Sequence, residues 1–256
     1  MSHTLFISDL HLCQSRPAIN ELFFDFLKNT APQAQALYIL GDLFEYWIGD
    51  DDIDAGLNGQ AAKALAVLAD SGTKIYFMHG NRDFLIGERF AELARLTILS
   101  DPTLIELYGR RTLLMHGDTL CADDIDYQRF RTQVRAENWQ KVFLAKPLEV
   151  RRAEVEAMRA GSETAKQAKP IGIKDVAEDE VRALLRRYDG PALIHGHTHR
   201  RARHDLDMNG YHTQRWVLPD WYETGGYLKT TLEGDWQFFE ISAVPGRAQP
   251  AGNGGF

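Results

Sequence analysis

The sequence predicts an α/β fold in which buried strands alternate with helices, and three observations point to this class. Five short apolar runs are continuous rather than alternating, which is typical of strands covered on both faces. Helical patterns separate these runs, and alternating, aromatic runs follow them. With 256 residues and 44% apolar composition, the chain is long enough to bury a full core.

Each predicted strand runs into small or polar residues of the kind that bind metals. The five runs are TLFISDLHL (4–12), ALYILGDLFEYW (36–47), KIYFMHGNRD (74–83), TLLMHGDTL (112–120) and ALIHGHTHR (192–200). Loops that follow strands often carry ligand sites in α/β proteins. The ends of these runs are therefore the first place to look for chemistry.

Helical patterns fill the intervals between the strands. The segment 17–29 opens with Pro17, which suits the first position of a helix. The segment 59–72 ends at Gly72, which suits a helix C-terminus. Apolar residues at three- and four-residue spacing predict a further helix at 88–96.

From about residue 201 the alternating, aromatic runs and the turn sequences Asn209-Gly210 and Gly234-Asp235 predict a largely antiparallel second half-sheet. The tail 243–256 is rich in Pro, Gly and Ala and is predicted to be disordered. We expect a single domain over 1–242 that includes a helical insertion at 125–174.

The predicted insertion differs in charge from the rest of the chain. It holds eleven Lys or Arg residues against six acids, a net charge of +5, so the remainder carries −12 of the total of −7. Apolar residues are interspersed among the basic ones. Two interpretations remain open: solvated amphipathic helices packed on the body, or a cap whose basic and apolar surfaces meet an anionic, apolar substrate or a membrane surface.

Composition excludes several functional classes. An overall charge of −7 argues against non-specific nucleic-acid binding, which needs a basic field. There are two cysteines and no basic, then apolar, leader at the start, so we expect a reduced, cytosolic compartment. No window approaches the roughly 18 apolar residues of a membrane-spanning helix, so any membrane contact is expected to be peripheral.

Seven potential metal ligands follow the five predicted strands. Asp9 and His11 are two residues apart on an extended segment, so their side chains point to the same side, and the same spacing relates His195 and His197. The other three are Asp42, Asn81 and His116. Burying such a set is costly unless positive charge lies between its members.

The chemistry of these donors narrows the choice of metal. Imidazole mixed with carboxylate and one amide oxygen suits Mn, Fe, Co or Zn rather than Mg or Ca. Seven donors overfill a single site that must also keep open positions, so two ions bridged by a carboxylate are expected.

The motif order D-x-H, G-D, G-N, H-G-D, G-H-x-H over residues 9–197 resembles the calcineurin-like metallophosphoesterases. This resemblance implies a four-layer α-β-β-α sandwich with two metal ions. It implies a first ion held by Asp9, His11, Asp42 and His197, and a second held by Asp42, Asn81, His116 and His195. Asp42 would bridge the two ions.

Four stretches, GDLFEYWIGDD, HGNRDFL, LMHGDTLC and IHGHTHR, look much like the branch of this family that hydrolyses UDP-2,3-diacylglucosamine in lipid A biosynthesis. That resemblance implies a peripheral enzyme on the cytoplasmic face of the inner membrane, with two Mn²⁺ ions per chain and no obligatory protein partner. Water would attack the α-phosphorus, giving UMP and 2,3-diacylglucosamine 1-phosphate (lipid X).

The same resemblance implies a set of substrate contacts in the body and the cap. They are Asn81, Arg82, Asp124, Ser162, Lys166, Lys169 and His195. The cap matches the pattern of this branch less closely than the metal motifs do, because Lys166 stands where a Thr or Asn is expected.

Arg82 replaces the His that usually follows the Asn of the third motif in the wider family. An arginine cannot donate a proton at neutral pH, but it clamps phosphate oxygens in a bidentate manner. A phosphate leaving group needs little protonation, so Arg82 favours cleavage of a diphosphate over cleavage of a phosphate monoester. We therefore expect Arg82 to join the seven ligands as a catalytic group. The alternative is an ion pair with Asp83 or another acid of the loop.

Two other functions remain open. One is a metallophosphoesterase for another nucleotide, such as a cyclic nucleotide or a soluble dinucleotide. The other is a non-catalytic scaffold, which is expected to have lost ligands, whereas all seven are present here.

Several remaining polar residues are expected to have structural roles only. His79 is expected to anchor its loop and His199 to lie beyond the metal shell. The acidic run Asp50–Asp52 with Asp54 is expected to be a solvated loop.

Overall fold

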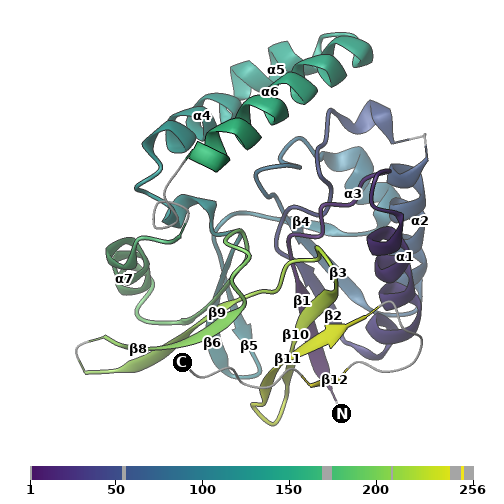
Figure 1. Ribbon diagram of the computed structural model, residues 1–256. Coiled ribbons are helices and arrows are strands. Elements are labelled where there is room, and N and C mark those ends of the chain that lie inside the picture. Colours follow the sequence, from purple (N-terminus) through teal and green to yellow (C-terminus); the bar gives the residue numbers. More distant parts are fainter. Residues whose placement is uncertain (1, 54–55, 169–174, 209, 243–248, 251–256) are drawn as a thin grey trace.

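Two β-sheets pack face to face in the computed structural model of the protein, helices cover their outer faces, and a helical layer lies over one end (Figure 1). The structure describes residues 2–53, 56–168, 175–208, 210–242 and 249–250, and it describes the side chains of the longest helix only as far as residue 159.

The first sheet has seven strands in the order β12-β11-β10-β1-β2-β3-β4, with β1 to β4 parallel. Its strands are β1 (His3–Ile7), β2 (Ala36–Ile39), β3 (Lys74–Met78), β4 (Thr97–Leu99), β10 (Gly225–Thr231), β11 (Trp236–Ile241) and β12 (Gln249–Pro250). Strand β10 pairs antiparallel with β1 and places the C-terminal hairpin beside the N-terminal strand.

The second sheet has five strands in the order β5-β6-β7-β9-β8. Its strands are β5 (Thr103–Leu107), β6 (Arg110–Met115), β7 (Ala192–His195), β8 (Ala202–Asp207) and β9 (His212–Val217). The central strands β6, β7 and β9 are parallel, so β6 and β7 deliver their loops to the same end of the sheet.

Alternate residues of β1 contact different layers, which explains why the strand is apolar throughout. Leu5 and Ile7 belong to a core shared with the helices α1 (Pro17–Asp25), α2 (Leu57–Asp70) and α3 (Glu88–Ala94). Phe6 belongs to a second core between the two sheets, which α7 (Glu178–Arg187) closes on the far side. The predicted four-layer α-β-β-α sandwich is confirmed.

All five predicted buried strands and all three predicted helices are present, with the first helix continuing as a π-helical turn over Phe26–Thr30. The C-terminal strands pair largely antiparallel as predicted, β8 with β9 and β10 with β11, but the prediction that they form one second half-sheet is wrong. Strands β8 and β9 extend the second sheet, whereas β10 and β11 extend the first. The predicted disordered tail, 243–256, falls outside the described residues except for the two residues of strand β12, which pair with β11.

The insertion forms a helical cap made of α4 (Ile125–Arg135), α5 (Glu137–Leu144) and α6 (Leu148–Ala168). Figure 1 shows the three cap helices, in teal and green, over the ends of the strands. Helices are present as predicted over 125–168, and residues 169–174 of the predicted insertion lie outside the described residues.

Ion pairs fix helix α6 to the loop that follows β2. The guanidinium of Arg151 is 2% exposed and donates to the carbonyl of Ile48 and to both carboxylate oxygens of Asp51. Arg152 donates to Asp52 over 3.0 Å at the surface. The acidic run was predicted to be a solvated loop, but it anchors the cap, while Asp54 lies outside the described residues.

The two adjacent arginines allow a matched test of this anchor. We expect Arg151→Met to destabilise the protein by about 1.5–3 kcal/mol, because it removes charged hydrogen bonds to a buried carbonyl and a carboxylate. Arg152→Met removes an exposed pair and is expected to cost about 0–1 kcal/mol. Urea unfolding and limited proteolysis within 125–168 measure both effects, and equal behaviour of the two variants would contradict this role for Arg151.

Candidate metal centre

The loops after five strands meet at one seam between the two sheets. The Asp9 amide donates to the Gly41 carbonyl over 3.1 Å, which joins the loops after β1 and β2. The His197 amide donates to Asp9 Oδ2 over 2.9 Å, which ties the second sheet to the first. The seven predicted ligands therefore come from two sheets, and not from the edge of one open sheet.

Two glycines permit the close approach of these loops. A Cβ atom on Gly80 would lie 2.1 Å from Asp42 Oδ1, and one on Gly196 would lie 2.4 Å from Asp9 Oδ2. Both distances are far below van der Waals contact. The glycines of the G-N and G-H-x-H motifs are thus required by packing against the two carboxylates.

Backbone strain concentrates in the same loops. Among the described residues eight non-glycine residues have positive φ, and five of these belong to the candidate metal centre. They are Asp9, His11, Asp42, His197 and His199. Such conformations cost of order 1–3 kcal/mol each and persist where surrounding contacts impose them, as they do at many functional sites.

Asp42 lies between histidines on either side. Its Oδ2 is 3.8 Å from His11 Nε2, and its Oδ1 is 3.9 Å from His116 Nε2. The Arg82 amide donates to Oδ1 over 2.8 Å and orients the carboxylate. This central position fits the bridging role that the family resemblance implies.

Side-chain donors converge in two groups within 4.8 Å: Asp9, Asp42 and His116, and Asp9, His11 and His199. Asp9 Oδ1 and His11 Nδ1 are buried and face titratable side chains: His199 Nε2 lies 3.3 Å from Asp9 Oδ1, and Glu45 Oε2 lies 3.1 Å from His11 Nδ1. Carboxylate oxygens and imidazole nitrogens gathered in this way are ligands that divalent transition metals accept. The donor set therefore fits divalent metal ions.

The remaining predicted ligands lie against these groups. Asn81 Oδ1 accepts from His116 Nε2 over 3.1 Å and from His197 Nδ1 over 2.8 Å. His195 Nδ1 donates to the Gly196 carbonyl over 2.8 Å. Its Nε2 lies 3.3 Å from Arg215, a neighbour that sequence reasoning did not identify.

Burial and neighbouring charges shift the pKa values of the groups in the candidate metal centre. Burial would raise the pKa of Asp9, but the charges of His199, His116 and His11 outweigh it and hold the pKa well below its ordinary value. Burial would lower the pKa of His116, yet Asp42, Asp9 and Asp118 raise it to about 9. Burial beside Arg215 lowers the pKa of His195 to about 3.

The first and last residues of the HGNRD loop (79–83) hold it in place. Asp83 is fully buried and accepts from the amides of Gly80 (2.8 Å), Leu43 (2.7 Å) and Asp42 (3.3 Å), so it joins two metal loops. Burial and the neighbouring Asp42 raise its pKa to about 7. His79 Nε2 donates to the Ile86 carbonyl over 2.7 Å, which confirms its role as a loop anchor.

Glu45 connects the metal centre to the cap, a role that sequence reasoning missed. Its carboxylate lies 3.1 Å from His11 Nδ1, 2.8 Å from the guanidinium of Arg159 on α6, and 3.9 Å from Arg82 NH1. Burial would raise the pKa of Glu45, but His11, Arg82 and Arg159 lower it to about 2. The acid nearest Arg82 is thus Glu45 rather than Asp83.

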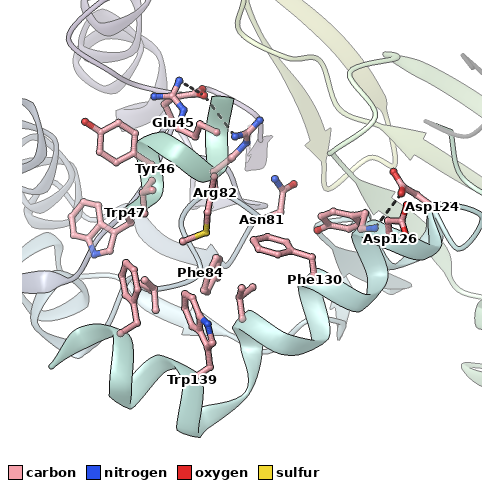
Figure 2. Close-up of a pocket in the computed structure, with 17 residues that line it drawn as sticks. Glu45, Tyr46, Trp47, Asn81, Arg82, Phe84, Asp124, Asp126, Phe130 and Trp139 are labelled. Atoms are coloured by element: carbon pink, nitrogen blue, oxygen red, sulfur yellow. Dashed lines mark hydrogen bonds and ion pairs between the residues drawn. The ribbon is translucent and has the colours of Figure 1, made fainter. Parts of the chain in front are cut away.

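A cavity of about 390 Å³ lies between the cap and the body beside these groups. Figure 2 shows Glu45 and Arg82 at one side and the Trp139 ring at the other, with Phe84 between them. Most of the remaining lining is apolar. It includes Trp47, Leu85, Phe130, Val134, Phe143, Val155 and Met158.

The cavity includes some of the predicted substrate contacts. Asn81, Arg82 and Asp124 line it, and Asp124 also caps helix α4 by accepting from the Tyr127 amide over 3.1 Å. Ser162 and Lys166 lie on α6 beyond the described side chains, and Lys169 lies outside the described residues. Their substrate contacts therefore stay predictions, as does that of His195.

Residues 2–201 match the family model of the calcineurin-like phosphoesterases. The chain belongs to this family. It is 53% identical over 225 residues, covering 88% of this chain and 91% of the other, to the UDP-2,3-diacylglucosamine hydrolase of Aromatoleum aromaticum. It is 50% identical to the proteins of that name from Xanthomonas axonopodis pv. citri and Escherichia coli O7:K1, over 90% of this chain and 96% and 95% of theirs.

His116 makes the binding of a divalent metal dependent on pH. Its raised pKa of about 9 means that the metal-free protein holds a proton there at neutral pH, and a bound metal must displace it. We expect affinity to rise by about tenfold per pH unit between about pH 6.5 and 8.5. Titration calorimetry with Mn²⁺ measures this slope, with His212→Asn, a change of an exposed histidine, as the control. An affinity independent of pH would contradict the assignment.

Proposed function

We propose that the protein hydrolyses the diphosphate of UDP-2,3-diacylglucosamine, giving UMP and 2,3-diacylglucosamine 1-phosphate in lipid A biosynthesis. The position of Asn81 carries the proposal, because this residue lines the apolar cavity and its Oδ1 lies 3.1 Å from His116 Nε2 in the candidate metal centre. A single substrate with acyl chains and a diphosphate fits both features. The relatives described above carry the name of this reaction.

We infer that two Mn²⁺ ions occupy the centre, held by the seven predicted ligands with Asp42 as the bridge. The mixture of imidazole, carboxylate and amide donors supports this choice. Bound there, the ions would act as Lewis acids and lower the pKa of an attacking water. Asp9 and Asp42 are buried and fixed by backbone amides, so they would keep their positions as the phosphate group enters.

Arg82, which lines the cavity, supplies the positive charge that binding of a diphosphate requires. Its side chain is 15% exposed, its NH1 is 3.9 Å from Glu45, and its Nε has no hydrogen-bond partner among the described residues. A weakly engaged guanidinium of this kind can clamp phosphoryl oxygens as charge develops on them. The departing sugar phosphate needs no proton, so a histidine is not required at this position.

The cavity accounts for the acyl chains. Its wall is formed by aromatic and aliphatic side chains from both the body and the cap, among them Trp47, Phe84, Trp139 and Phe143. Burying apolar surface there would contribute about 25 cal/mol per Å². A soluble dinucleotide or a cyclic nucleotide has no aliphatic chain to cover the aliphatic part of this wall, which includes Leu85, Val134, Val155 and Met158, so this competing substrate class is less suited to the cavity.

Product analysis tests the reaction. Purified protein with Mn²⁺ and UDP-2,3-diacylglucosamine in ¹⁸O-water is expected to release UMP that carries the label. Absence of UMP would overturn the substrate, and label in the sugar phosphate would overturn attack at the α-phosphorus. Asn81→Ala and His116→Ala are expected to abolish turnover, and Arg82→Gln to lower kcat by about 10²–10³-fold through lost charge stabilisation.

We also propose that the protein works at the cytoplasmic face of the inner membrane as a peripheral protein. Among the described residues no helix is long and apolar enough to span a bilayer. On the cap, Val142, Leu144 and Val150 are 57%, 40% and 43% exposed, and the basic residues Lys141 and Arg152 flank them in the sequence. Exposed apolar and basic side chains on one amphipathic segment favour binding to an anionic bilayer.

Vesicle flotation tests the membrane proposal. The protein is expected to float with vesicles that contain phosphatidylglycerol, and the Val142→Asp, Val150→Asp double variant is expected to bind them less, because it places charge at the apolar contact. Val67→Asp changes a residue that is 70% exposed on α2, away from the cap, and serves as the control. Equal flotation of all three proteins would contradict a membrane role for the cap.

A further inference from the structure

An exposed aromatic ring, Tyr222, lies beside the metal centre in the loop between β9 and β10. It is 55% exposed, and its ring centroid is 5.4 Å from that of His199 and 6.0 Å from that of His11. Among the described residues the other exposed aromatic side chains are Phe130, which lines the cavity, and Tyr211. Tyr222 is not part of the cavity wall.

The backbone beneath Tyr222 is fixed to the metal loops. The amide of Trp221 donates to the Asp9 carbonyl over 3.1 Å, and its indole is fully buried against Phe23 and Phe26. Arg16 donates to the carbonyls of Trp221 and Tyr222. The exposed ring is therefore held in place before any ligand arrives, which lowers the entropy cost of binding.

Arg16 also places its guanidinium carbon 4.7 Å from the centre of the Tyr222 ring. This contact covers one face with a cation. More than half of the side chain nevertheless remains open to solvent. The open part offers an aromatic surface for a planar ligand.

A carboxylate lies next to this ring. Asp220 Oδ2 is 3.7 Å from His199 Nδ1, and the Asp220 side chain is 28% exposed. The other ring nitrogen of His199 is 3.3 Å from Asp9 Oδ1. A continuous row of groups thus leads from the metal centre through His199 to Asp220 and Tyr222 at the surface.

Side chains of the cavity and of this surface contact different nitrogens of the His11 ring. Glu45 lines the cavity and contacts His11 Nδ1, whereas His199 contacts His11 Nε2 over 3.4 Å, at the opposite side of the same ring. A diphosphate joins two halves of a substrate. If the acylated sugar occupies the cavity, the nucleoside half extends past the centre on another side.

We propose that Tyr222 and Asp220 form the nucleoside subsite, with the uracil ring stacked on Tyr222 and the ribose hydroxyls bound by the Asp220 carboxylate. This inference rests on the proposed function for the identity of the substrate. Bases stack on exposed aromatic rings irrespective of sequence, and acidic side chains bind ribose hydroxyls in other nucleotide sites. His199 lies between this subsite and the centre.

Calorimetry with UMP on the Mn²⁺-loaded protein tests the stacking without turnover. We expect Tyr222→Ala to weaken UMP binding by about 5- to 50-fold, as loss of one stacked base predicts. Tyr222→Trp and Tyr222→Phe keep a ring and are expected to keep the affinity within about threefold. Inorganic phosphate, which lacks the base, is expected to bind all four proteins equally.

Tyr211→Ala is the matched control, because Tyr211 is an exposed tyrosine (38%) on the turn before β9. Its UMP affinity is expected to equal that of the unaltered protein. Unchanged UMP affinity in Tyr222→Ala would overturn the stacking. Equal losses for UMP and phosphate would also overturn it, since they would show damage to the metal centre.

A second variant tests the ribose contact. The unaltered protein is expected to bind UMP more tightly than 2′,3′-dideoxy-UMP, and Asp220→Asn is expected to reduce that difference. An unaltered protein that does not distinguish the two ligands would overturn the assignment of Asp220. If UMP binds through Tyr222 but no UMP is released from UDP-2,3-diacylglucosamine, the proposed reaction fails while the nucleoside subsite stands.

Discussion

The burial of two carboxylates at the seam between the sheets is the constraint on which the rest of the structure depends. Asp9 and Asp42 are 0% and 2% exposed, and ionised groups at such depth require positive charge or donated hydrogen bonds. The protein supplies backbone amides, histidines on both sides, and glycines that let the loops approach. The left-handed backbone conformations of these loops follow from the same demand, because the chain must turn its carboxylates inward from the ends of parallel strands.

The cap depends on the metal centre through shared charges as well as shared packing. Glu45 contacts His11 and forms an ion pair with Arg159 of α6. A few residues further along, Asp51 and Asp52 form ion pairs with Arg151 and Arg152. The basic face of α6 therefore lies against an acidic loop that begins at the second metal motif. This complementarity explains the charge asymmetry of the sequence, in which a segment of net charge +5 interrupts an otherwise acidic chain.

The strands and the seven candidate ligands were predictable because each depends on local sequence: a continuous apolar run that ends in small and metal-binding residues. The layer order was predicted only from the resemblance to the family. The role of Glu45 was not predictable from the sequence, because its partner Arg159 is 114 residues away and the ion pair forms only when the cap packs on the body. His199 was placed beyond the metal shell, yet its positive φ brings it within 3.3 Å of Asp9 Oδ1. The distribution of β8 to β11 between two sheets depends on long-range pairing, which alternation within a strand does not specify.

The two sides of the site differ in polarity, which favours one orientation of the substrate. The cavity is apolar and lies between the body and a cap held by ion pairs, whereas the surface at Tyr222 is open and carries a carboxylate and a cation. A substrate with one acylated half and one nucleoside half matches this difference. Binding in the reverse orientation would leave the acyl chains in water, and the binding free energy lost would grow with the apolar area left exposed. Because Arg82 lines the cavity, it would contact the phosphate attached to the sugar. The attacked phosphorus would then be the one on the nucleoside side, nearer to the carboxylates.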